Sequence, residues 1–80
     1  MRPKAIDVKI LEDYKLEILF NNNEKKIFDV KPYFKFKKFQ EIRDIKKFSK
    51  VRIAGLSIEW DNGIDICPDE LYNNSKKAEE

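Results

Sequence analysis

The sequence predicts a small single α+β domain with the element order β-β-β-α-β-β, in which antiparallel hairpins pack with one short helix and a C-terminal helical turn. Apolar and polar residues alternate over the first thirty positions, which indicates strands. The apolar spacing changes to about three between residues 33 and 48, which indicates a helix, and alternation returns after residue 50. Eighty residues correspond to one domain. We expect it to span residues 1–72, with a polar, frayed tail over residues 73–80.

Three strands are expected before residue 31. Their inward-facing residues are predicted to be Ile6, Val8, Ile10, Leu16, Ile18, Phe20, Phe28 and Val30. The three asparagines from Asn21 to Asn23 mark a turn, because asparagine tolerates the left-handed region. A loop of three or five residues keeps the apolar side chains on one face. The predicted cross-strand pairs are therefore Ile18 with Phe28 and Leu16 with Val30.

The next segment is expected to be helical. Pro32 ends the third strand, and Phe36, Phe39 and Ile42 then recur at every third position. This spacing predicts a short helix over residues 35–43, with Ile45 as a further candidate for its buried face. Asp44 is an expected N-cap for one more turn that runs through residue 48.

Two strands are expected after the helix. The apolar phase of the first changes across Ala54 and Gly55, which predicts a β-bulge or a bend at Gly55. A loop over residues 61–63 with a left-handed Gly63 places Trp60 opposite Ile64 and Ile58 opposite Ile66. A two-residue turn would place Trp60 opposite Asp65. We prefer the three-residue loop, because it keeps the apolar face intact.

Several residues are assigned structural roles. Pro68 is expected to end the last strand, and a helical turn then packs Leu71 and Tyr72 on the core. Asp29 is expected to cap the Pro32 segment or to bond neighbouring backbone. The predicted structural residues are Phe28, Asp29, Gly55, Trp60, Gly63, Pro68, Leu71 and Tyr72.

The residue types argue against catalysis. The chain has no histidine, which is the commonest acid–base group near neutral pH and the commonest metal ligand. Asp61, Asp65, Asp69 and Glu70 lack the spacing of a calcium loop, so we interpret them as a solvated edge. Cys67 is interpreted as an ordinary half-buried residue. We therefore expect no enzyme activity, no metal site and no cofactor.

The same composition bears on compartment. One cysteine fits a reducing environment. Neither a signal peptide nor an apolar run of about 18–20 residues is present in the sequence given. The expectation is a cytoplasmic protein without membrane contact.

Charge is unevenly distributed along the chain. Residues 31–50 hold eight positive and two negative side chains, whereas residues 57–80 hold two positive and seven negative ones. Basic residues interleaved with aromatic ones are typical of single-strand nucleic-acid binders, but a charge run on a helix is also an ordinary solvated face. Asp65 is directed away from its apolar neighbours. The candidate interaction residues are Lys35, Lys37, Lys38, Arg43, Lys46, Lys47 and Asp65.

The stretch from Tyr14 to Tyr72 resembles a family of bacterial proteins, domain-of-unknown-function family 2442. The most specific part is Ile58-Glu59-Trp60-x-x-Gly63-x-Asp65-Ile66-x-Pro68-x-x-Leu71-Tyr72, and Phe28-Asp29-Val30 precedes it. One departure is Asn23, where the family pattern has glycine. The resemblance implies a small bacterial or phage-associated protein, alone or joined to a helix-turn-helix domain. It also implies a gene beside another small gene, as in toxin–antitoxin pairs, and it carries no catalytic residues.

These observations favour a non-enzymatic protein-interaction module. The expected partner is a second copy or the small product of an adjacent gene. A second copy could dock its acidic hairpin on the basic helix, or pair through an exposed edge strand. The alternative function is a nucleic-acid-binding accessory domain that uses residues 31–50.

Overall fold

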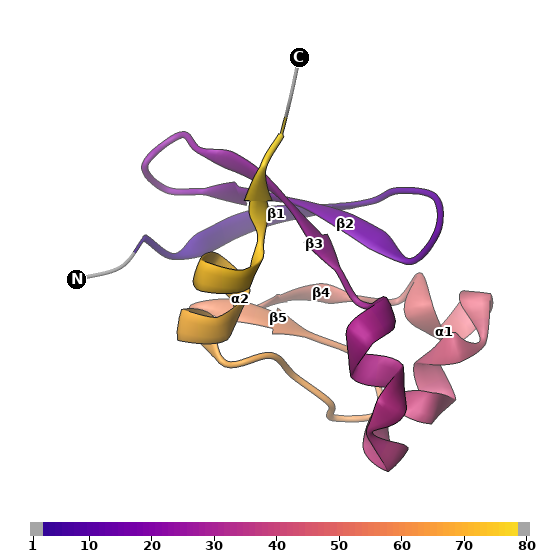
Figure 1. The fold of residues 1–80 in the computed structure, drawn as a ribbon. Coiled ribbons are helices and arrows are strands. Elements are labelled where there is room, and N and C mark those ends of the chain that lie inside the picture. Colours follow the sequence, from indigo (N-terminus) through magenta and orange to yellow (C-terminus); the bar gives the residue numbers. More distant parts are fainter. Residues whose placement is uncertain (1–2, 79–80) are drawn as a thin grey trace.

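The computed structural model of the chain describes residues 3–78 and confirms the predicted α+β class. Antiparallel strands form a four-stranded sheet in the order β1-β2-β3-β6 and a separate β4–β5 hairpin. In Figure 1 the large sheet lies above the hairpin, and helical segments close the structure beside them. The strands are β1 (Ala5–Ile10), β2 (Lys15–Phe20), β3 (Lys25–Asp29), β4 (Arg52–Ala54), β5 (Ser57–Glu59) and β6 (Lys76–Lys77). The helical segments are the 3-10 helices η1 (Lys31–Lys35) and η2 (Lys37–Arg43) and the α-helices α1 (Ile45–Phe48) and α2 (Pro68–Asn74).

The β2–β3 hairpin has the predicted apolar face but a different register. Leu16 pairs with Phe28, and Ile18 pairs with Lys26, so both predicted pairs are wrong by two residues. The three-residue loop is the cause, because it closes directly on Phe20, whose N–H donates to the Glu24 carbonyl at 2.9 Å. Asn23 has φ 71° and supplies the left-handed residue of this loop. The side-chain period is two, so the apolar face survives the shift.

Strand β1 differs from its predicted face. Ile6 is 46% exposed and Ile10 is 40% exposed, whereas Ala5 is buried. The register with β2 slips between Ala5 and Asp7, which leaves Ile6 outside the regular alternation. Ile10 pairs with Leu16 but is the last residue of the edge strand, and its side chain stays exposed there. The prediction that all three alternating residues of this strand reach the core is therefore wrong for Ile6 and Ile10, and only Val8 packs against the core.

The spacing of three between residues 33 and 48 reflects 3-10 helices rather than one α-helix. A 3-10 helix has three residues per turn, so Phe39 and Ile42 fall on one buried face. Phe36 lies in extended conformation between η1 and η2 and is 47% exposed, which corrects its predicted core position. Asp44 caps α1 as predicted, since its Oδ1 accepts the Lys46 N–H at 3.0 Å. Ile45 is exposed.

The phase change at Gly55 is a turn between two strands, not a bulge within one. Ala54 pairs with Ser57, and Gly55 takes φ 59° in the connection. The loop that follows Trp60 is the predicted one. Gly63 has φ 88°, and the Trp60 N–H donates to the Ile64 carbonyl at 2.8 Å. Asp65 then forms a single bridge with Glu59 rather than a longer strand.

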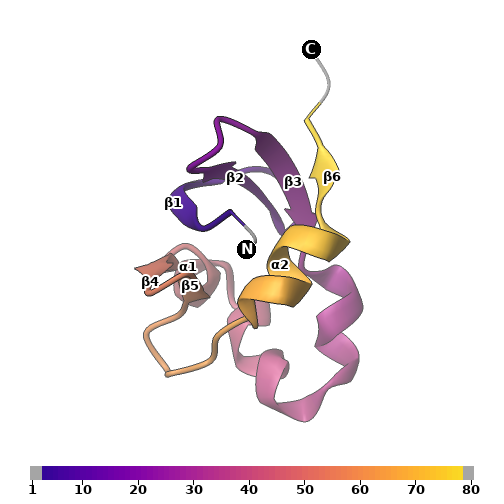
Figure 2. The same ribbon diagram turned by 90° about the vertical axis from the view of Figure 1, so that its left-hand side faces the viewer.

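The chain after Tyr72 is more regular than its composition suggests. Helix α2 continues to Asn74, and β6 pairs with β3 through Lys76–Ile27 and Lys77–Lys26. Figure 2 shows β6 beside β3. Residues 73–78 therefore do not match the expected frayed tail, and residues 79 and 80 lie outside the described part. Backbone pairing does not depend on apolar side chains, which explains why the polar composition failed to reveal this strand.

The core is centred on Trp60, which is fully buried and donates its Nε1–H to the Phe48 carbonyl at 2.9 Å. Tyr14 has φ 58°, an uncommon value for an aromatic residue. Its ring meets Phe34 and Phe48 edge-on, with centroids 5.0 Å and 5.1 Å away. Its hydroxyl donates to the Arg43 carbonyl. Tyr14 thus ties the β1–β2 turn to the helical segments.

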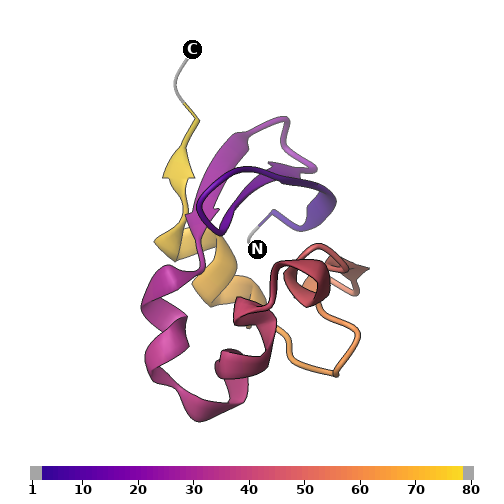
Figure 3. The same cartoon turned by 90° about the vertical axis from the view of Figure 1, so that its right-hand side faces the viewer.

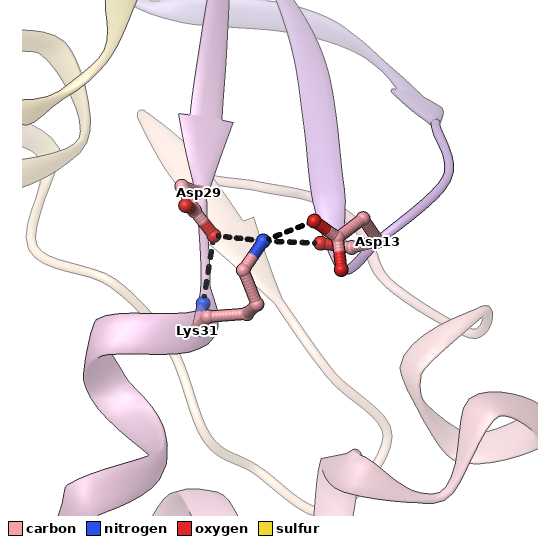
Figure 4. A network of polar contacts seen from close by, with 3 residues as sticks. All are labelled: Asp13, Asp29 and Lys31. Atoms are coloured by element: carbon pink, nitrogen blue, oxygen red, sulfur yellow. Dashed lines mark hydrogen bonds and ion pairs between the residues drawn. The ribbon is translucent and has the colours of Figure 1, made fainter.

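Lys31 joins the start of η1 to the β1–β2 turn (Figure 4). Its Nζ lies 2.8 Å from Asp13 Oδ2 and 3.2 Å from Asp29 Oδ1. Asp29 also accepts the Lys31 backbone N–H at 3.0 Å, which confirms the expected bond to neighbouring backbone. The hydrogen bond from Lys31 lowers the pKa of Asp13 and raises that of Lys31. Lys31 is therefore a structural cation rather than part of a free basic surface.

Tyr72 fastens α2 to the β2–β3 hairpin. Its hydroxyl donates to Glu24 Oε1, and its ring lies under Lys26 Nζ at 3.6 Å from the centroid. Phe20 meets the same ring edge-on at 5.0 Å. The Tyr72 hydrogen bond, followed by that from Asn22, lowers the pKa of Glu24 below its ordinary value. The expected packing role of Tyr72 is confirmed.

The stability of the fold is expected to fall in acid through Glu24. A lowered pKa means that the folded state binds the proton less tightly than the unfolded state. This contribution is complete above the ordinary glutamate pKa and is lost as the pH falls through the lowered folded pKa. Thermal unfolding between about pH 7 and about pH 3 should show a smaller loss for Glu24→Gln than for the wild type. Glu12→Gln is the control, since Glu12 is exposed and has no hydrogen bond within the described chain; equal slopes in both variants would contradict the assignment.

Candidate interaction site

Two adjoining hollows open between the 3-10 helices and the segment that leads into α2. They have volumes of about 590 Å³ and about 280 Å³ and share Tyr33, Phe36 and Glu70. We call them together the Phe36 groove. Its lining residues are Pro32, Tyr33, Lys35, Phe36, Lys38, Phe39, Asp65, Ile66, Cys67, Glu70 and Asn74.

The walls of the Phe36 groove come from the two oppositely charged parts of the sequence. Lys35 and Lys38 belong to the basic segment, whereas Asp65 and Glu70 belong to the acidic one. Figure 3 shows η1 and η2 on one side of the molecule, with the β4–β5 hairpin and the segment after it on the other. The charge asymmetry of the sequence therefore becomes two facing walls within one chain.

A hydrogen-bonded contact joins these walls at one point. The Tyr33 hydroxyl donates to Glu70 Oε2 at 2.6 Å and accepts from Asn74 Nδ2 at 3.3 Å. Partial burial, followed by the hydrogen bond to Glu70, raises the pKa of the Tyr33 phenol. The phenol therefore remains protonated at neutral pH and fixes α2 against η1. These two hydrogen bonds hold the walls of the groove together at this point.

Phe36 is the most exposed aromatic side chain on the groove. Its ring centroid lies 6.3 Å from that of Tyr33 and 6.5 Å from that of Phe39, and its far side faces solvent. Lys35 Nζ lies 5.3 Å from the same centroid. The sequence did not indicate that Phe36 is exposed, because no proline or glycine marks the break between η1 and η2.

The structure gathers three of the seven predicted interaction residues at this groove, namely Lys35, Lys38 and Asp65. Neither lysine forms an ion pair within residues 3–78, and Asp65 is exposed. Lys37 is exposed nearby but does not line the hollows. Cys67, expected to be half-buried, is exposed and lines the groove.

The remaining predicted interaction residues lie elsewhere. Arg43 stacks over Phe34 at 6.0 Å and donates to Gln40 at 3.3 Å. Lys47 pairs with Glu41 at 3.1 Å, and Lys46 is exposed on α1. The basic segment therefore does not present one continuous cationic surface.

A smaller hollow of about 250 Å³ lies beside Trp60 and Lys47. Most of the polar side chains that line it form hydrogen bonds or ion pairs within the chain. Asn62 donates to Glu41 at 2.8 Å, and this bond and that from Lys47 lower the pKa of Glu41. Asp61 pairs with Arg52 at 2.8 Å. Most polar groups of this hollow are therefore engaged within the chain, and Lys50 lines it as an exposed cation.

Two other kinds of site are absent from the described residues. Over residues 3–78, no group of three or more His, Cys, Asp or Glu side chains is placed to hold a metal ion. In the same range, no helix combines the length and the apolar character needed to cross a membrane.

The fold and the groove define a small α+β domain with a preformed, mixed-charge surface groove. Residues 5–77 match the family described as "Protein of unknown function (DUF2442)", and the chain belongs to this family. This confirms the resemblance carried by residues 14–72. No curated protein and no solved structure matches the chain.

Proposed function

We propose that this chain is a non-enzymatic module that binds a protein partner at the Phe36 groove. The observation that carries the proposal is the exposed Phe36 ring between exposed carboxylates and two lysines that form no ion pair within residues 3–78. Exposed aromatic side chains are favoured anchors of protein interfaces, and a polar rim around them supplies orientation.

The charge arrangement specifies the kind of partner. One wall carries Lys35 and Lys38, and the other carries Asp65 and Glu70. A segment that places an apolar side chain against Phe36, with an acidic residue toward the lysines and a basic residue toward Asp65, satisfies both walls. The small product of an adjacent gene, which the family resemblance implies, is the proposed source of such a segment.

The groove favours protein over nucleic acid. Asp65 and Glu70 would repel phosphates brought close to Phe36, and phosphate contacts dominate nucleic-acid affinity. Lys31 and Lys47 are engaged in ion pairs within the chain. The alternative is that residues 31–50 bind single-stranded nucleic acid. The experiment must therefore distinguish bound nucleic acid from a bound protein.

Affinity capture from native lysate treated with nuclease tests the proposal. The wild type should retain a defined protein, and Phe36→Ser should lose it, since Phe36 is exposed and its replacement spares the core. Ile45→Ser is the matched control, because Ile45 is 54% exposed and does not line the groove; it should capture as the wild type does.

Charge variants sharpen the same test. Lys38→Glu should weaken capture, whereas Lys46→Glu, which makes the same charge change on α1, should not. The proposal is overturned if the captured protein is insensitive to Phe36→Ser. It is also overturned if only nucleic acid is captured and is released by nuclease or salt.

A further inference from the structure

The outer edge of β1 is the second surface with unexplained apolar exposure. Ile6, Ile10 and the turn residue Leu56 are 46%, 40% and 52% exposed, which makes three of the five exposed large apolar residues in the described chain. Leu56 adjoins β1, because its carbonyl accepts the Ala5 N–H at 3.3 Å. None of these residues lines the Phe36 groove.

The backbone of β1 beyond Ala5 has an unpaired edge. β1 is the end strand of its sheet, and Leu11 donates its N–H to the Lys15 carbonyl at 2.9 Å. In an antiparallel pair, the backbone N–H and C=O groups of successive residues point to alternate sides of the strand. Those of Asp7 and Lys9 therefore point toward β2, whereas those of Val8 and Ile10 point away from it. The Val8 N–H donates to the Asp7 side chain at 3.0 Å, and no strand within residues 3–78 accepts it.

The side chains along this edge are self-complementary about Val8. The pattern of apolar and charged residues is symmetric about Val8, in the order Ile6-Asp7-Val8-Lys9-Ile10. The two charged residues beside Val8 have opposite signs. An antiparallel second copy centred on Val8 therefore brings Asp7 opposite Lys9 of the second copy, and Lys9 opposite its Asp7. The same pairing brings the exposed Ile10 of each copy toward the exposed Ile6 of the other, which lies at the irregular end of the strand. Such a self-complementary contact is what a two-fold dimer requires.

We propose that two copies of this chain pair through β1, antiparallel and centred on Val8, to form a sheet that continues across the dimer. On pairing, the Asp7 carboxylate leaves the Val8 N–H and turns to Lys9 of the second copy. The Val8 N–H of each copy then donates to the Val8 carbonyl of the other, and the Asp7–Lys9 pairs lie on one face. The opposite edge of the sheet makes a contrast. β6 consists of the exposed Lys76 and Lys77, which repel a second copy of themselves.

Charge reversal tests this pairing without touching the core. Light scattering coupled to size exclusion should give twice the 9.6 kDa chain mass at high concentration, up to about 1 mM because so small an interface is weak. Asp7→Lys and Lys9→Asp, each measured alone, place like charges opposite each other and should weaken the dimer about tenfold or more. The two variants mixed together restore both ion pairs, so the mixture should form a heterodimer.

A matched control and a backbone variant complete the experiment. Lys37→Asp makes the same charge change as Lys9→Asp at an exposed site away from β1 and should dimerise as the wild type does. Val8→Pro removes an N–H that β2 does not use and should also give a monomer. A monomeric wild type over the whole concentration range overturns the proposal. So does a dimer that persists in Asp7→Lys and Lys9→Asp, or a mixture of the two that fails to associate.

Discussion

Replacing Trp60 by alanine is expected to destabilise the fold by about 3–5 kcal/mol, because Trp60 has the largest of the fully buried side chains in the described residues. Trp60 is fully buried, and its ring contacts Phe39 and Phe48 at centroid distances of 6.4 Å and 6.1 Å. A small domain has a total stability near the low end of about 5–15 kcal/mol. Urea denaturation should therefore show a strongly lowered midpoint or an unfolded protein.

Trp60→Phe separates packing from hydrogen bonding at this site. Phenylalanine fills most of the volume but leaves the Phe48 carbonyl without its donor, which should cost about 1–3 kcal/mol. A loss below about 1 kcal/mol for Trp60→Ala would contradict the placement of Trp60 at the centre of the core.

Replacing Leu71 by alanine is expected to cost about 2–5 kcal/mol. Leu71 is the fully buried residue of α2, and this helix positions both Glu70 on the Phe36 groove and β6 on the sheet. The loss should therefore appear as a lower denaturation midpoint and as faster amide hydrogen exchange over residues 68–78.

A matched leucine provides the control for this prediction. Leu56 is 52% exposed at the β4–β5 turn, so Leu56→Ala should change the stability by less than about 0.5 kcal/mol. Equal losses from the two leucine variants would show that α2 is not packed as the structure has it.

The sequence was most informative where apolar alternation and turn residues agree. The faces of β2 and β3 follow from the period of two, and the Trp60–Ile64 pairing follows from the left-handed Gly63. The cap at Asp44 follows from its residue type. Each of these features is determined within a few neighbouring residues, so local chemistry suffices to predict it.

The errors arose where distant parts of the chain decide the local structure. The alternation of apolar and polar residues is unchanged when a strand shifts by two residues, so it does not determine the register. The β2–β3 register depends instead on the length of the loop over residues 21–23. Strand β6 exists because β3 offers it an edge, and nothing in Lys76–Lys77 indicates a strand. A turn at Gly55 and a bulge at Gly55 leave the same change of phase in the sequence.

The candidate site was predictable in its charges but not in its geometry. The basic and acidic segments were evident, and Lys35, Lys38 and Asp65 were identified as interaction residues. Their convergence across one groove depends on the tertiary packing of η1, η2 and the segment after Gly63. Phe36 was assigned to the core because its spacing fits the buried stripe, and only the break between the two 3-10 helices exposes it.

The affinity of the captured partner for the purified wild type and two variants tests the interaction module most directly. Titration of that partner should give a Kd for Phe36→Ser at least about thirtyfold weaker than for the wild type, as expected for an aromatic anchor worth about 2 kcal/mol. Ile45→Ser should stay within about twofold of the wild type. Equal affinities for the wild type and Phe36→Ser would contradict the assignment of the Phe36 groove as the binding site.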